Sequence, residues 1–251
     1  MQWSKLGIWD DNILKEKDIE IFPEFVKFAF EWVNTQSRMA YTDRHILRLI
    51  HFDNLEHFLK HGIYSKNSGH IIPDYVNIGD TTLIKQRETF TVRIDPPNGN
   101  LGDYIPFYFA GHSPMLLNIK TGSRGIKQFP QKDLVYVKCK ISDIIDHCPE
   151  WCFTDGHAKN HLTMFYNNID DLTKLDWDII SKQYWYNTED DYDRMRRKQA
   201  EFLVKRQVPT NCICGLIVLT PEQEERARAI QQQTGTNIPI YVDNKRRYFF
   251  P

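Results

Sequence analysis

The apolar segments of this chain are short, and they do not alternate regularly with helical segments. The clearest strand-like segments lie at 44–51, 132–141 and 214–220, where apolar residues alternate with polar ones or run together briefly. Regular alternation of strands and helices is the pattern of parallel sheets that are covered by helices on both faces. Its absence predicts an α+β fold with a mixed or antiparallel sheet.

Turn and cap signals place further elements between these strands. Asp53 or Asn54 is expected to cap a helix that Gly62 ends. A charged helix, opened by proline and closed by glycine, is expected over 221–235. The remaining strands are expected at 90–94, 104–109, 115–119, 238–242 and 246–250, and the remaining helical segments at 154–167 and 172–186.

The first forty residues form a leader that carries one helical signal. Pro23 suits a first helical turn. The apolar residues at helical spacing around it are Phe22, Val26, Ala29, Phe30 and Val33. We expect that stripe to pack against the rest of the protein. The sequence therefore predicts an N-terminal helical extension of unassigned role over 1–40, followed by one domain over 41–251.

The charge balance argues against a general affinity for polyanions, because the formal net charge is −1. An anionic partner must then be held by a local cationic patch. The first residues lack the cationic start and apolar core of a signal peptide, and no apolar run approaches the ~18 residues of a membrane span. The five cysteines show no spacing of a disulfide framework. The sequence predicts a cytoplasmic protein with reduced thiols and no membrane partner.

Common nucleotide-binding and nucleophile motifs are absent from the sequence. The chain holds neither G-x-G-x-x-G nor a P-loop, and no serine lies in a G-x-S-x-G turn. Four residues of suitable type for zinc are Cys148, Cys152, His157 and His161. The four residues between the two pairs, FTDG, are fewer than a zinc finger needs, although a compact knuckle can be built. A zinc-bearing, non-catalytic nucleic-acid-binding protein therefore stays open as an alternative.

A carboxylate, Glu201, lies inside the apolar run AEFLV, directly after a cluster of cations. A buried ionised carboxylate is costly unless it is paired or hydrogen-bonded, so Glu201 either pairs with a cation or lines a pocket. If the segment after 198 is a strand, Glu201 and Leu203 share one face at the rim of a sheet. A general base for an anionic substrate would be placed in this way.

The segment before Glu201 combines aromatic rings with cations. The rings, on which nucleic-acid bases can stack, are Tyr184, Trp185 and Tyr186, and the cations are Arg194, Arg196, Arg197 and Lys198. A solvated charged helix explains the cations equally well from composition alone. The carboxylate that follows favours a binding site for an anionic substrate that carries bases.

Seven stretches of the chain together resemble the DarT family of DNA ADP-ribosyltransferases, the toxins of DarT–DarG toxin–antitoxin modules. They occur in the family's order within 41–251: LRLIHFDNLEHFLKHGI, VNIGDTTLIKQR, LGDYIPFYFAGHSPMLLNI, RGIKQFP, FTDGHA, LDWDII and RKQAEFLV. The resemblance implies an ADP-ribosyltransferase fold, in which NAD binds in a cleft between two small mixed or antiparallel sheets with flanking helices. That mode of binding agrees with the missing nucleotide fingerprints.

The resemblance also implies roles for single residues. Glu201 matches the catalytic glutamate, Arg87 the catalytic arginine and His157 a supporting residue near the DNA base. The implied NAD-binding residues are Leu49, Ile50, His51, Asn54, Gly62 and Arg87. The implied DNA-binding residues are His157, Tyr184, Trp185, Tyr186, Arg194, Arg196, Arg197 and Lys198. NAD is expected as a substrate, and no metal is expected.

The function implied by the resemblance is that of a toxin. It would transfer ADP-ribose from NAD to thymidine bases in single-stranded DNA, in a sequence-dependent manner, release nicotinamide and block DNA replication. A macrodomain antitoxin of the DarG kind would remove the modification. Glu201 would then line a pocket as general base, and Arg87 would contact the pyrophosphate. A guanosine-directed or protein-directed transferase of the same fold and the non-catalytic binding protein are the alternatives.

Overall fold

The computed structural model describes residues 26–27 and 41–251. The chain divides between Ala40 and Tyr41, and the unit from Tyr41 to Pro251 holds every element described below. Of the leader helix expected around 22–33, only 26–27 are described, and both residues are helical. The rest of that prediction lies outside the described residues.

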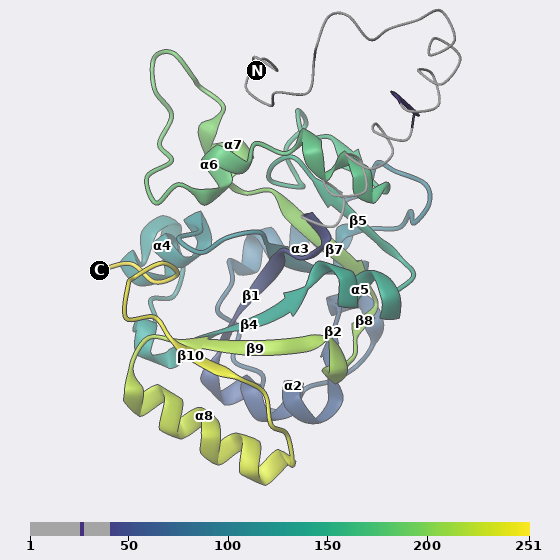
Figure 1. Ribbon diagram of the computed structural model, residues 1–251. Helices are drawn as coiled ribbons and strands as arrows, with labels where there is room; N and C mark the ends of the chain where they lie inside the picture. Colours follow the sequence, from purple (N-terminus) through teal and green to yellow (C-terminus); the bar gives the residue numbers. More distant parts are fainter. Residues whose placement is uncertain (1–25, 28–40) are drawn as a thin grey trace, which may run out of the picture. The chain divides into compact units, whose positions relative to one another are not determined.

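An eight-stranded sheet organises the unit 41–251 (Figure 1). Its strand order is β10-β9-β4-β1-β3-β7-β5-β6, and a separate ribbon pairs β2 with β8. β9 and β10 run parallel, and the other neighbouring strands are antiparallel. The bounds are β1 His45–His51, β2 Ile63–Tyr64, β3 Tyr104–Tyr108, β4 Leu134–Lys140, β5 Trp151–Thr154, β6 Phe165–Tyr166, β7 Glu201–Lys205, β8 Gln207–Val208, β9 Ile213–Val218 and β10 Ile240–Val242. The predicted α+β class with a mixed sheet is confirmed.

The large sheet consists of two four-stranded halves that meet at its centre. β1 pairs with β4 along its whole length, but it pairs with β3 only at Leu47↔Tyr108. Beyond that pair the two strands separate, and Nη1 of Arg48 bridges them with a 3.0 Å hydrogen bond to the Pro106 carbonyl. The expected cleft between two small sheets therefore corresponds to a split within one larger sheet.

Helices flank this sheet, and α2 and α8 pack against each other below β9 in the view of Figure 1. The bounds are α2 Leu55–His61, α3 Thr81–Glu88, α4 Pro114–Thr121, α5 Ile141–His147, α6 Trp177–Ser181, α7 Arg194–Lys198 and α8 Pro221–Thr234. Short 3-10 turns are η3 Phe52–Asn54, η4 Lys66–Ser68, η5 Leu101–Asp103, η6 Ser123–Gly125, η7 Gln131–Asp133, η8 Ile169–Lys174 and η9 Thr210–Cys212. Across the described residues, none of the helices has the length and apolar character needed to cross a membrane.

Local caps explain where helix α3 and the long helix α8 begin. The Asp80 carboxylate accepts the amides of Thr82 and Leu83, which fixes the start of α3 at Thr81, six residues before Arg87. A capping box of Thr220 and Gln223 opens α8, as the sequence predicts for 221–235.

Apolar side chains cover both faces of the sheet. On β1, Ile46 and Ile50 pack into the cluster that contains Phe202, whereas Leu47 and Leu49 pack into a second cluster beneath α4. A strand that is buried on both faces leaves little room for charged groups. The few that it carries, such as Arg48, therefore mark places where the packing opens.

Two predicted elements have a different structure because local hydrogen bonds compete with the expected pattern. The segment 115–119 is helical, since the Ser113 hydroxyl accepts the Leu116 N–H and Pro114 suits the first turn of α4. The segment 154–167 is not a helix but the end of β5, a loop and β6. In that loop the Asp155 carboxylate accepts the Met164 N–H, which closes a turn instead of a helix.

Two predicted strands are also absent from the described residues. At 90–94 there is only an isolated bridge between Thr91 and Asn100. The segment 246–250 forms no strand, because the buried Asp243 carboxylate accepts three consecutive amides, those of Arg247, Tyr248 and Phe249. These amides are therefore satisfied without a neighbouring strand.

Candidate active site

Arg87 and Glu201 form a bidentate ion pair. Arg87 lies in the last turn of α3, and Glu201 is the first residue of β7. Nη1 of Arg87 donates to Oε1 of Glu201 at 3.1 Å, and Nη2 donates to Oε2 at 2.8 Å. The side chains are 13% and 3% exposed, so water screens the pair only weakly. The structure thus joins the two residues that the sequence predicts to be catalytic.

Further contacts fix the carboxylate and the backbone of Glu201. The Ala158 N–H donates to Oε1 at 2.9 Å, and the Glu201 N–H donates to the Thr154 hydroxyl at 3.1 Å. Burial alone raises the pKa of Glu201, but the Arg87 charge acts against burial, and the pKa lies below its usual value. His157 and the Ala158 N–H act in the same direction. Glu201 is therefore a fixed carboxylate that is ionised at neutral pH.

The structure corrects the expected setting of Glu201. β7 carries Glu201 and Leu203 on one face and Phe202 on the other, in agreement with the predicted alternation. However, Glu201 is only 2% exposed, and the cation beside it is bound to it. The prediction that Glu201 lines an open pocket instead of pairing with a cation is wrong in this structure. Arg87 is correspondingly directed at Glu201.

A cavity of about 490 Å³ adjoins the ion pair. It lies where β1 and β3 separate, and its lining includes Arg48, Arg87, Pro106 and much of the segment 64–77. Nε of Arg48 is buried and has no hydrogen-bond partner among the described residues. Arg48 lines the cavity, and a guanidinium in such a place is suited to bind a phosphate group.

Three of the predicted NAD-binding residues have structural roles. Leu49 and Ile50 are enclosed in the core, at 5% and 2% exposed, so contact of their side chains with a ligand is excluded in this structure. Gly62 has a φ of 83°, and a Cβ there would lie 2.5 Å from the Val208 carbonyl oxygen. The glycine is needed because β8 approaches so closely. None of the three lines the cavity.

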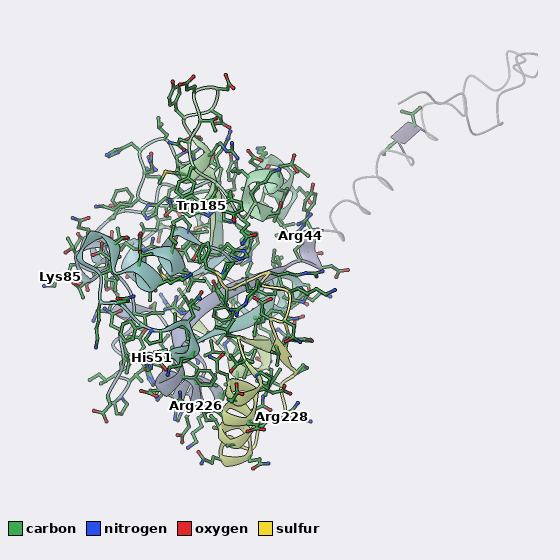
Figure 2. All side chains as sticks on the ribbon, turned by 90° about the vertical axis from the view of Figure 1, so that its left-hand side faces the viewer. Arg44, His51, Lys85, Trp185, Arg226 and Arg228 are labelled. Atoms are coloured by element: carbon green, nitrogen blue, oxygen red, sulfur yellow. The ribbon has the colours of Figure 1, made fainter. Side chains whose placement is uncertain are left out.

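His51 and Asn54 lie at the end of β1, outside the lining of this cavity. Nδ1 of His51 accepts the Asp53 N–H at 3.2 Å, which leaves Nε2 for a ligand. Asp53 pairs with Arg226 of α8 at 2.6 Å, and Figure 2 shows His51 and Arg226 at the same end of the molecule. The Asn54 side chain is bound to the backbone of Val76. Contact of either residue with NAD stays a prediction.

His157 lies in the loop that contacts Glu201. It precedes Ala158, and its charge acts on Glu201 in the direction that lowers the carboxyl pKa. Its backbone N–H donates to the Arg196 carbonyl at 3.1 Å, which ties the loop to the segment before β7. The structure therefore places His157 beside the predicted catalytic glutamate, and its contact with a DNA base stays a prediction.

Three of the four predicted DNA-binding cations are already used inside the protein. Arg196 and Arg197 each pair with two aspartates. Lys198 is 4% exposed and donates to two backbone carbonyls, and burial lowers its pKa to about 8. The prediction that Lys198 holds DNA phosphate is wrong, and the charges of the two arginines are largely neutralised. Arg194 has no carboxylate partner within 41–251 and stays a candidate.

The three predicted stacking rings separate into two groups. The loop between α6 and α7 extends away from the sheet (Figure 1), and it exposes 72% of Tyr184 and 58% of Tyr186. Trp185 is 3% exposed, and its Nε1–H donates to the His112 carbonyl at 3.0 Å. Figure 2 shows Trp185 within the body of the molecule. Trp185 is thus an anchor of this loop, and the prediction that a base stacks on it is wrong.

The residues of the zinc alternative are not assembled. Cys152 is fully buried in β5, and Sγ of Cys148 lies 3.7 Å from the Gln207 carbonyl oxygen. In the part of the chain that the structure describes, no group of three or more His, Cys, Asp and Glu side chains is arranged to hold a metal ion. All five cysteines are free thiols. The alternative therefore loses its structural basis.

Sequence reasoning missed two residues of the site, Arg48 and Tyr108. Arg48 interrupts the apolar run 46–50, which is the same kind of signal that identified Glu201. Tyr108 pairs in register with Glu201 across β3 and β7, and burial, followed by the Glu201 charge, raises its pKa. No local signal marks Tyr108, because only strand pairing brings it to the carboxylate.

Comparison with protein families identifies a relationship over most of the chain. The model of the DarT family, described as ssDNA thymidine ADP-ribosyltransferase, matches residues 47–250. A DNA ADP-ribosyl transferase of Escherichia coli is 31% identical over 205 residues, which cover 82% of this chain and 93% of the relative. One from Mycobacterium tuberculosis is 32% identical over 154 residues, 61% of this chain and 66% of the relative.

Solved structures agree with the sequence relationship. DarT of Thermus sp. 2.9 in complex with ADP-ribosylated ssDNA superposes with a TM-score of 0.74 at 26% identity, covering 82% of this chain and 97% of that one. The same protein in complex with NAD+ gives a TM-score of 0.70 at 26% identity, covering 82% and 98%. Since the family model and the E. coli relative each span most of the chain, this protein belongs to the DarT family of DNA ADP-ribosyltransferases.

Proposed function

We propose that this protein transfers ADP-ribose from NAD to a thymidine base in single-stranded DNA, in a sequence-dependent manner, with release of nicotinamide. The observation that supports this most directly is the buried Arg87–Glu201 pair beside a cavity that the Arg48 guanidinium also lines. Membership of the DarT family makes the protein an NAD-dependent DNA ADP-ribosyltransferase. The choice of thymidine is supported by the description of that family.

The cavity fits NAD in size and charge. A volume of about 490 Å³ lies in the usual range for small-molecule sites. The guanidinium of Arg48, which lines the cavity, suits the pyrophosphate, a task that the family resemblance had suggested for Arg87. The Thermus relative has been solved with NAD+, which supports NAD as the donor here. Arg48 therefore binds the pyrophosphate, and Arg87 controls the glutamate.

The first chemical demand on the site is the positive charge that develops on the ribose as the bond to nicotinamide breaks. Nicotinamide leaves with the electron pair of that bond. The Glu201 carboxylate supplies fixed negative charge in a place that water screens weakly. Arg87 and the Ala158 N–H hold this carboxylate in place and keep it ionised.

The second demand is removal of the proton from the ring nitrogen of thymine. As the nitrogen bonds to the sugar carbon it gains positive charge, so its proton becomes acidic enough for a carboxylate of low pKa. Glu201 accepts this proton, and the base becomes neutral again. General-base catalysis of this kind contributes about 10²–10⁴ in rate. For this step one oxygen of Glu201 exchanges its bond to Arg87 for the substrate.

The acceptor strand is held by the loop between α6 and α7. Tyr184 and Tyr186 are exposed for base stacking, and Arg194 is available for a phosphate. Because Trp185 anchors this loop from within, the two tyrosines are presented by a supported segment. Stacking alone discriminates weakly between bases. The sequence preference therefore depends on contacts with the base that enters the cleft.

In the cell, the modification would act as a toxin. An adduct on the Watson–Crick edge of thymine prevents pairing, so replication stops at the modified base. A macrodomain antitoxin of the DarG kind would remove the ADP-ribose. This part of the proposal rests on the family resemblance. Expression of the protein with and without such a macrodomain, with growth and DNA synthesis as readouts, tests it.

The acceptor is tested with four single-stranded oligonucleotides, each of which offers only one type of base, T, G, A or C, as the target. The protein is incubated with NAD, and the digested DNA is analysed by mass spectrometry. We expect ADP-ribosyl thymidine from the T oligonucleotide only, and none from Glu201→Gln. A guanosine product would replace the proposed acceptor, and absence of any DNA product would contradict the proposed function.

A further inference from the structure

Arg93 makes three hydrogen bonds to one loop. Nη1 donates to the His161 carbonyl at 2.9 Å, and Nη2 donates to the carbonyls of Asn160 and Thr163 at 2.7 and 2.9 Å. The guanidinium also lies 5.3 Å from the ring centre of Phe165, where β6 begins. Within 41–251 no carboxylate pairs with Arg93, so its donors serve this loop.

The loop 155–164 connects Arg93 to Glu201. At one end, Arg93 donates to the carbonyls of residues 160, 161 and 163. At the other end, the Ala158 N–H donates to Oε1 of Glu201 at 2.9 Å. Between these points the Thr163 hydroxyl donates to the His157 carbonyl at 2.9 Å, which keeps the loop folded back on itself. The position of the Ala158 N–H is therefore linked to the bonds of Arg93.

Apolar packing holds the start of this loop, where Ala158 is fully buried in a core cluster, but not its far part. Leu162 and Met164 are 73% and 58% exposed. Further polar contacts support the loop: Arg196 pairs with Asp155 at 2.7 Å, Lys159 contacts Gln86, and the Met164 N–H donates to Asp155. Polar contacts thus fix the conformation of this loop, and a planar guanidinium that spans three carbonyls constrains it in a way that a single donor does not.

We propose that Arg93 is a positioning residue of the active site, which holds the Ala158 N–H against the Glu201 carboxylate through the loop 155–164. It touches neither the reacting groups nor, on this geometry, the DNA base. The consequence for the reaction rests on the proposed role of Glu201 as general base. The structural link itself is independent of that role.

The first test uses the full chain with Arg93→Ala, Arg93→Lys and the control Arg228→Ala. Arg228 lies on α8 with 62% of its side chain exposed (Figure 2), far in sequence from the loop. A misplacement of about 1 Å can reduce a rate by about 10²-fold, so we expect kcat of Arg93→Ala to fall by about ten- to a hundredfold. KM for NAD should stay unchanged. Lysine keeps the charge but not the fork, so an intermediate kcat is expected.

The second test reads Glu201 without any acceptor. Titration of ¹³C-labelled glutamate side chains by NMR gives its pKa, with Glu201→Gln used to identify the signal. The groups that face this carboxylate are Arg87, His157, Tyr108 and Cys152. Loss of the Ala158 bond removes one lowering influence, so the pKa should rise by about one unit in Arg93→Ala. The acid limb of the pH–rate profile should then move to higher pH.

The two proposals fail separately. A wild-type protein that modifies no DNA contradicts the proposed function, while the NMR titration still tests Arg93. Thermal unfolding shows whether Arg93→Ala is folded. If the folded variant keeps both the wild-type kcat and the wild-type Glu201 pKa, the positioning role is overturned. A loss of kcat with an unchanged Glu201 pKa overturns it as well, because the effect then reaches the reaction by another route.

Discussion

Arg87 and Glu201 are 114 positions apart in the sequence, yet their guanidinium and carboxylate groups form two hydrogen bonds, with nitrogen–oxygen distances of 3.1 and 2.8 Å. The contact joins the end of α3 to the start of β7. Burial makes the pair strong in electrostatic terms but costly in desolvation. A group that is retained at such a cost is expected to serve the reaction, and the proposed role of Glu201 provides that reason.

Replacing Glu201 by Gln should remove activity while the protein stays folded. The amide keeps one oxygen for Arg87 but has no negative charge and accepts no proton, so we expect the rate to fall by about 10²–10⁴. DNA modification measured by mass spectrometry checks this. Lys85→Ala serves as a control. Lys85 is exposed on the same helix as Arg87, so its loss should leave the rate unchanged (Figure 2). Equal rates for Glu201→Gln and wild type would exclude Glu201 as the base.

Removing both members of the ion pair should destabilise the fold by less than the sum of the two single losses. Arg87→Ala or Glu201→Ala leaves an unpaired buried charge, which costs about 3–5 kcal/mol. In the double variant neither charge is left, so its loss should be smaller than the sum by about 1–3 kcal/mol. Urea titration gives the free energy of unfolding of the wild type, the two single variants and the double variant, which together form a double-mutant cycle. Additive effects would show that the contact contributes no coupling.

Acid should weaken the wild-type fold through Glu201. Its folded pKa lies below the usual value, so the folded state binds this proton less readily than the unfolded chain. The contribution of the pair is complete above about pH 5 and is lost as the pH falls through the folded pKa. Between pH 7 and 3, the wild type should lose more unfolding free energy than Glu201→Gln. Parallel curves for the two proteins would contradict this.

Alkali should relieve the cost of burying Lys198. Its folded pKa of about 8 lies below the value of about 10.4 for an unfolded lysine. Between these pH values only the unfolded chain holds the proton, so stability rises with pH. Between pH 7.5 and 10 the rise should be about 2 kcal/mol relative to Lys198→Met, which lacks the titrating group. Urea titrations at pH 7.5 and 10 measure this difference. An equal change of unfolding free energy with pH in wild type and Lys198→Met would refute the prediction.

The exposed and buried rings of the α6–α7 loop should respond differently to replacement by alanine. Tyr184→Ala and Tyr186→Ala each remove an exposed ring, so we expect DNA binding to weaken by about 1–3 kcal/mol per stacked base with little change in stability. Trp185→Ala removes a buried anchor and should cost about 3–5 kcal/mol of stability. Fluorescence anisotropy with a labelled oligonucleotide and thermal unfolding separate the two. Unchanged DNA affinity in both tyrosine variants would exclude the loop as the DNA contact.

Local patterns were sufficient where neighbours in the chain decide the structure. The strands at 44–51 and 132–141 and the helix at 221–235 were predictable from periodicity and caps. The pattern failed at 115–119 and 154–167, where the hydrogen bonds of single residues such as Ser113 and Asp155 changed the backbone. Such competition involves one or two side chains and leaves no periodic signal.

The sequence by itself pointed to the two residues that we propose to carry the chemistry: Glu201, a carboxylate in an apolar run, and Arg87, the arginine of IKQR that the family resemblance identified. It did not reveal that the two are partners, that Lys198 is buried, or that Tyr108 and Arg48 lie beside them. Those facts depend on which strands pair and on where the sheet splits. A residue's chemical type is a local property of the chain, whereas its burial, its partner and its pKa are set by distant segments that only folding brings together.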